Sequence, residues 1–122
     1  MSRYPSVSIE KIPAPGLVEL VESGKAKSPE ATALLTDILA PYQGKLDALV
    51  LGCTHYPFVK DSISRILGPE VALLDGGAGT ARQTARCLAQ AGLVNDGPGS
   101  VTIENSLGTP EMLTLSAQLL EM

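Results

Sequence analysis

Two short, uninterrupted apolar runs constrain the fold of this chain more than any other feature. They occupy residues 48–51 (Ala-Leu-Val-Leu) and 71–74 (Val-Ala-Leu-Leu), and each leads into a glycine-containing turn. Runs this short indicate strands buried on both faces, as in a parallel sheet covered by helices. Alternating apolar and polar residues at 7–12 and 100–105 predict two further strands.

Helical patterns lie between these predicted strands and after the last of them. Ser28-Pro29-Glu30 and Thr109-Pro110-Glu111 each combine a capping residue, a proline for the first helical position and an acid for the positive end of the helix dipole. Helical segments are also predicted at 17–22, at 58–67 and after the turn at 75–80, the last ending near Gly92. Alternation of strand and helix predicts an α/β fold, a parallel sheet with flanking helices.

Composition excludes several classes of function. The net charge is −4 and no basic stripe is present, so nucleic-acid binding has no electrostatic support. Without a run of 18 apolar residues or a signal-like N-terminus, we expect no membrane partner and a cytoplasmic location. Two cysteines, Cys53 and Cys87, are too few for a disulfide scaffold or a cysteine-based metal site.

The segment 52–57 combines side chains that could perform chemistry. It follows a predicted strand at the edge where parallel sheets bind ligands. Here Cys53, Thr54 and His55, the sole histidine, are consecutive. A thiol near a helix N-terminus is stabilised as the thiolate, a hydroxyl can bind a carboxylate, and an imidazole can carry a proton. Gly52 leaves room for close approach of a ligand. Cys53 could instead be a small buried hydrophobe or a redox thiol, and His55 a surface residue.

The run 49–57, Leu-Val-Leu-Gly-Cys-Thr-His-Tyr-Pro, resembles the signature around the second catalytic cysteine of the glutamate racemases. Three other segments resemble that family in the same order, at 14–24, 71–88 and 106–109. The resemblance therefore covers nearly the whole chain. It implies an isomerase that interconverts L- and D-glutamate for peptidoglycan synthesis by two-cysteine proton transfer, without a cofactor or a metal.

The resemblance also implies individual roles. Cys53 corresponds to one of the two proton-transfer thiols, and His55 to the imidazole that assists it. Glu22 corresponds to the acid that orients this imidazole, and Thr54, next to Gly52, to a contact with the carboxylate of the substrate. The substrate expected is glutamate or a related acidic amino acid.

A complete family member also has a first half, with an Asp-Ser pair and the other cysteine in a Cys-Asn-Thr motif. This sequence has no Cys-Asn-Thr motif, and its one Asp-Ser dipeptide, at 61–62, follows the Cys53 segment instead of preceding it. By resemblance, residues 1–92 are part of the second α/β domain. Residues 93–122 are a strand–helix tail that would pack on the first domain, so that its helix exposes an apolar face here. Such a chain would need the N-terminal racemase half or a homodimer partner, and we expect little or no activity from it alone.

Other interpretations of the chain remain open. It could be a decayed, non-catalytic racemase module that serves in folding or interaction. The glycine-rich turn at 75–80 could bind phosphate, although it lacks the spacing of known phosphate loops, and the plainer interpretation is a tight turn capped by Asp75. Cys87 is expected to pack in a helix as a small hydrophobe.

Overall fold

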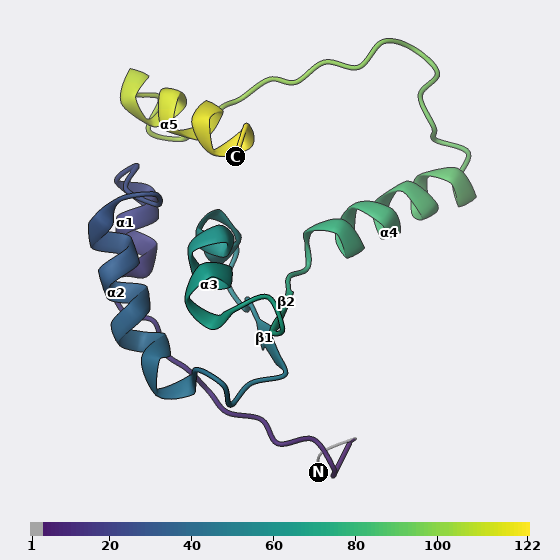
Figure 1. The fold of residues 1–122 in the computed structure, drawn as a ribbon. Helices are drawn as coiled ribbons and strands as arrows, with labels where there is room; N and C mark the ends of the chain where they lie inside the picture. Colours follow the sequence, from purple (N-terminus) through teal and green to yellow (C-terminus); the bar gives the residue numbers. More distant parts are fainter. Residues whose placement is uncertain (1–3) are drawn as a thin grey trace.

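The computed structural model describes residues 4–122, which form a series of helices and a small parallel sheet (Figure 1). The elements, in chain order, are α1 (Leu17–Glu22), α2 (Pro29–Leu39), η1 (Ala40–Tyr42), β1 (Ala48–Val50), η2 (Tyr56–Val59), α3 (Lys60–Leu67), β2 (Ala72–Leu74), α4 (Gly77–Gln90) and α5 (Pro110–Leu120). No helix within the described part of the chain is long and apolar enough to cross a membrane.

The sheet consists of β1 and β2, which pair in parallel with Val50 opposite Leu74. The pairing extends one residue beyond β1, where the Leu51 N–H donates to the Leu74 carbonyl at 2.8 Å. The connection between the strands runs through η2 and α3. The predicted α/β fold, a parallel sheet with flanking helices, is therefore confirmed.

One hydrophobic core joins α1, α2 and α3 to one side of the sheet. Leu49 and Leu73, from the middle of each strand, are half-buried against it. The buried residues of the core are Leu17, Val21, Ala26, Leu35, Leu39, Leu51, Val59, Ile63, Leu67 and Val71. All ten are aliphatic, and they fix the helices on the face of the sheet that carries Leu49 and Leu73.

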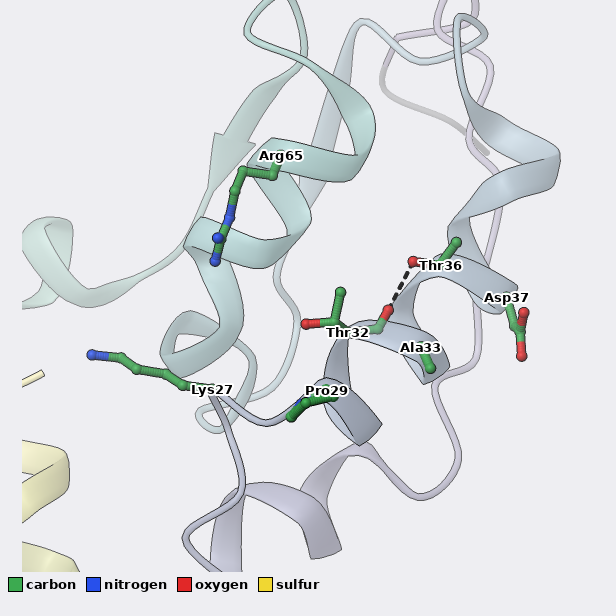
Figure 2. Close-up of a pocket in the computed structure, with 7 residues that line it drawn as sticks. All are labelled: Lys27, Pro29, Thr32, Ala33, Thr36, Asp37 and Arg65. Atoms are coloured by element: carbon green, nitrogen blue, oxygen red, sulfur yellow. Dashed lines mark hydrogen bonds between the residues drawn. The ribbon is translucent and has the colours of Figure 1, made fainter.

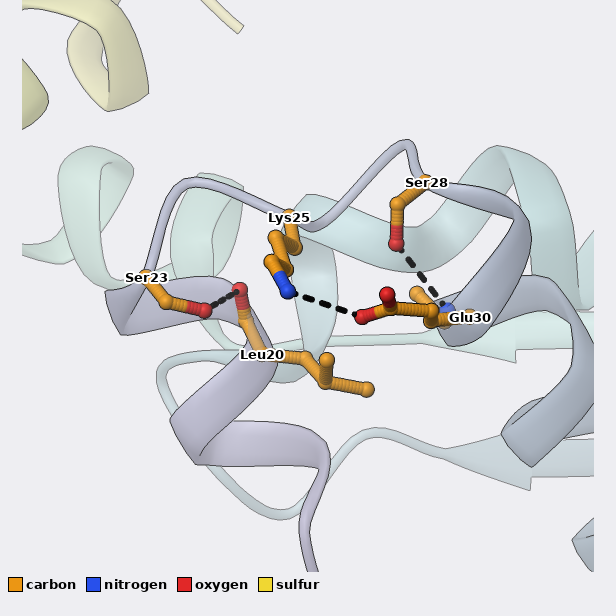
Figure 3. Close-up of polar contacts among 6 residues, drawn as sticks. Leu20, Ser23, Lys25, Ser28 and Glu30 are labelled. Carbon is orange, nitrogen blue, oxygen red and sulfur yellow. Dashed lines mark hydrogen bonds and ion pairs between the residues drawn. The ribbon is translucent and has the colours of Figure 1, made fainter.

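The start of α2 follows the sequence prediction. The Ser28 hydroxyl accepts a hydrogen bond from the Ala31 N–H at 3.1 Å, and Pro29 occupies the first helical position. Lys25 and Glu30 form an exposed ion pair across the same turn at 3.0 Å (Figure 3). Helix α5 starts in the same way, with Thr109 as the capping residue.

Two of the four predicted strands are wrong. Segments 7–12 and 100–105 have no strand structure, and Val7, Ile9 and Val101 are 55%, 77% and 77% exposed. An alternating segment becomes a strand only when a neighbouring strand satisfies its backbone, and neither segment has one among residues 4–122.

The prediction that both central strands are buried on both faces is also wrong. Val50 and Leu74 are 69% and 51% exposed. The core covers only the face that carries Leu49 and Leu73, and the opposite face has no covering layer among residues 4–122.

Helix α4 extends away from the rest of the molecule, and α5 returns to lie beside α1 (Figure 1). No residue of α4 is buried, and Cys87 is exposed. The expectation that Cys87 packs as a small hydrophobe is therefore wrong. In α5, Leu119 packs against the core. The division of the chain near residue 92 stays a prediction.

Candidate active site

The loop after β1 winds directly into the next helix. The Tyr56 N–H donates to the Cys53 carbonyl at 3.2 Å, and the Phe58 N–H donates to the His55 carbonyl at 3.2 Å. These consecutive turns lead into η2, where Val59 is buried in the core. The loop is therefore fixed on its inner side, while Cys53 and His55 remain half-buried near the surface.

Three side chains of this region form a continuous line. The Cys53 Sγ lies 3.7 Å from Nδ1 of His55, and Nε2 of His55 lies 3.0 Å from Oε1 of Glu22. The His55 side chain is 29% exposed and that of Glu22 is 59% exposed. When Nε2 donates to the Glu22 carboxylate, Nδ1 of a neutral ring is an acceptor and faces the thiol. The arrangement can therefore pass a proton between the sulfur and the imidazole.

Glu22 reaches the histidine because α1 is held in place by its apolar side. Leu17 and Val21 are 1% and 0% exposed in the core, and Glu22 is the last residue of the helix. The α1 helix contacts η2, which follows His55. The contact joins residues 33 positions apart, so it depends on packing between elements.

The two residues predicted to contact the substrate, Gly52 and Thr54, are both exposed beside Cys53. A Cβ atom added at Gly52 would meet nothing within 4 Å. The space in front of this glycine is therefore open to a ligand.

Sequence reasoning missed an ion pair next to this loop. Nζ of Lys60, the first residue of α3, lies 2.9 Å from Oδ2 of Asp75, which follows β2. The Asp75 Oδ1 accepts the Gly77 N–H at 2.9 Å. The hydrogen bond from Lys60, followed by that from Gly77, lowers the pKa of Asp75 below its ordinary value. The only sequence signal was the single acid at the start of the glycine-rich turn, where it was interpreted as a cap.

A separate surface groove lies between α2 and α3 (Figure 2). It has a volume of about 540 Å³ and is lined by Lys27, Pro29, Thr32, Ala33, Thr36, Asp37 and Arg65. The Thr36 hydroxyl donates to the Thr32 carbonyl at 2.8 Å. None of the predicted site residues lines this groove. No group of three or more potential metal-ligating His, Cys, Asp or Glu side chains occurs within residues 4–122.

Comparison with known proteins identifies relatives along nearly the whole chain. Glutamate racemase of Clostridium kluyveri is 41% identical over 124 residues, which cover 99% of this chain and 48% of the relative. That of Pseudomonas syringae pv. tomato is 41% identical over 113 residues, 91% of this chain and 41% of the relative. The chain is related to the glutamate racemases. It spans about half the length of the curated relatives that it matches. No protein-family model matches the sequence.

Solved structures of glutamate racemases share the fold. The racemase of Thermus thermophilus, in complex with β-chloro-D-alanine, superposes with a TM-score of 0.71 at 39% identity. That alignment covers 89% of this chain and 42% of the Thermus chain. The Francisella tularensis enzyme, in complex with D-glutamate, gives a TM-score of 0.67 at 24% identity, a likeness of fold.

Proposed function

We propose that this chain supplies one side of a glutamate racemase active site and that Cys53 is the proton-transfer group on that side. The observation that carries the proposal is the line from Glu22 through His55 to the Cys53 sulfur, with contacts of 3.0 and 3.7 Å. The relatedness to glutamate racemases supports glutamate as the substrate. In the cell, the reaction would supply D-glutamate for peptidoglycan synthesis in the cytoplasm.

In the proposed mechanism, the Cys53 thiolate removes the proton from Cα of glutamate. The Cα–H bond breaks, an S–H bond forms, and the electron pair stays on the substrate carbon and its carboxylate. A second thiol on the opposite face then donates a proton to Cα, which inverts the centre. His55 accepts or returns the thiol proton, and Glu22 holds the ring in position. Thr54 and the open space at Gly52 accommodate the substrate carboxylate.

The second proton-transfer group must come from outside the segment described. Cys87, the only other cysteine, lies exposed on α4, which extends away from the core. A first racemase half, or a second copy of the chain, would supply the opposite face. We therefore expect this chain alone to racemise glutamate slowly or not at all.

A chimera tests the proposal. The segment of the C. kluyveri racemase that matches this chain is replaced by it, and solvent deuterium incorporation into L- and D-glutamate is followed by NMR. The chimera should racemise glutamate, and Cys53→Ser should lower kcat by about 10²- to 10⁴-fold. Ser28→Ala, remote from the loop, is the control for general destabilisation.

Three outcomes would contradict the proposal. A folded chimera without activity would favour the non-catalytic module. Equal activity of the Cys53→Ser chimera would remove Cys53 from the reaction. Rapid deuterium incorporation into both enantiomers by the isolated chain would overturn the need for a second half.

A further inference from the structure

The loop that carries Cys53 is closed by two polar contacts with the end of β2. At its beginning, the Leu51 N–H donates to the Leu74 carbonyl at 2.8 Å. At its end, Nζ of Lys60 lies 2.9 Å from Oδ2 of Asp75, the residue after Leu74. Both ends of the segment 52–59 are therefore tied to two consecutive residues of the neighbouring strand.

Asp75 is held more firmly than an ordinary surface acid. Its side chain is 20% exposed, and its second oxygen accepts the Gly77 N–H at 2.9 Å. That bond fixes the carboxylate relative to the start of α4, so its orientation does not depend on Lys60. The oriented carboxylate of Asp75 can therefore hold Lys60, the first residue of α3, through the ion pair.

The ion pair between Lys25 and Glu30 provides a contrast within the same chain. Its side chains are 50% and 63% exposed, and its partners are five positions apart across one turn. The pair of Lys60 and Asp75 joins residues fifteen positions apart on different elements. Only the second pair involves an end of the segment 52–59, so only its loss is expected to free the loop that carries Cys53.

We propose that Lys60 and Asp75 are positioning residues that hold the Cys53 loop against the end of β2. The ion pair closes the loop that places the Cys53 sulfur beside His55. Any effect of this ion pair on catalysis rests on the proposed function of Cys53. Its role in holding the loop against the end of β2 does not.

The experiment compares Lys60→Met and Asp75→Asn with the unchanged chain. Amide hydrogen exchange of Tyr56 and Phe58 is measured by NMR, and alkylation of Cys53 by iodoacetamide is measured by mass spectrometry, with the exposed Cys87 as internal reference. Both variants should accelerate exchange at the two amides and change the ratio of the two alkylation rates, by about two- to fivefold. Lys60→Arg should restore the original values, because it can keep the ion pair. Lys25→Met, which removes the other ion pair, should leave all readouts unchanged.

The same variants in the racemase chimera add a catalytic readout. If Cys53 transfers the proton, Lys60→Met should lower kcat and leave KM within about twofold. The exchange and alkylation measurements require no racemase activity, so failure of the proposed function and failure of the positioning role are distinguishable. Unchanged exchange and alkylation in both variants would overturn the positioning role. Equal acceleration at amides of α2 would also overturn it, since the pair would then contribute only to general stability.

Discussion

Replacement of Val59 by alanine should lower the free energy of unfolding by about 2 kcal/mol. Val59 is 1% exposed and belongs to the core that joins the Cys53 loop to α3. The change removes the equivalent of two buried methylene groups, about 1.6 kcal/mol at ~0.8 kcal/mol each. The residual cavity raises the total to about 2 kcal/mol, because the surrounding core relaxes only in part. For a cooperative unit of this size, that corresponds to a decrease in Tm of about 10 °C.

The matched control is the same substitution at Val101. This valine is 77% exposed and lies outside any helix or strand, so Val101→Ala should change stability by no more than about 0.5 kcal/mol. Urea denaturation followed by far-UV circular dichroism measures both variants under one set of conditions. Equal losses at the two positions, or a loss below about 0.5 kcal/mol at Val59, would refute the assignment of Val59 to the core.

Three further predictions follow from the contacts described. Glu22→Gln should alter the alkylation rate of Cys53 without changing the circular dichroism spectrum, because it removes the negative charge next to Nε2 of His55 while keeping an oxygen that can accept the hydrogen bond. An unaltered rate would argue against a role of the Glu22 carboxylate in the environment of the thiol. Ser28→Ala should cost about 1 kcal/mol in urea denaturation through loss of the cap of α2, and no loss would contradict that cap. Asp75, whose pKa Lys60 lowers, binds fewer protons in the folded chain, so its contribution to stability is present above its ordinary pKa and is lost as pH falls through the lowered value. Asp75→Asn should therefore flatten the acidic side of the stability profile in urea denaturation, at pH values below the ordinary pKa of Asp75, and an unchanged profile would contradict the ion pair.

Local signals predicted the helix boundaries well. The Ser28-Pro29 and Thr109-Pro110 starts are both present, because a cap and a first-position proline act within a few residues of chain. The parallel pairing of β1 and β2 was also predictable, because two apolar runs joined by a helix leave few alternatives.

Errors arose where structure depends on neighbours that a local pattern does not reveal. Segments 7–12 and 100–105 alternate as strands do, yet no partner strand lies beside them among residues 4–122. Val50 has the apolar character of a covered position and is exposed, because the core packs on one face of the sheet. The prediction for Cys87 was wrong for the same reason, since no residue of α4 is buried against a neighbouring element.

The candidate site was predictable to different degrees. Cys53 and His55 stand two positions apart after a predicted strand, so their proximity follows from the local sequence. Nothing local links Glu22 to His55, and only the family resemblance pointed to it. The ion pair between Lys60 and Asp75 was not predicted, because no local sequence pattern indicates that a lysine and an aspartate fifteen residues apart are in contact.

Glu22, the partner of His55, comes from a short helix, and this determines the order in which the site unfolds. Helix α1, which supplies Glu22, has only six residues, too few to persist as an isolated helix in water. Its order depends on docking Leu17 and Val21 into the core. Fraying of this short segment would detach the acid from the ring while α2 and α3 remain folded. The thiol environment should thus change at mild denaturant concentrations, before the main loss of helical signal.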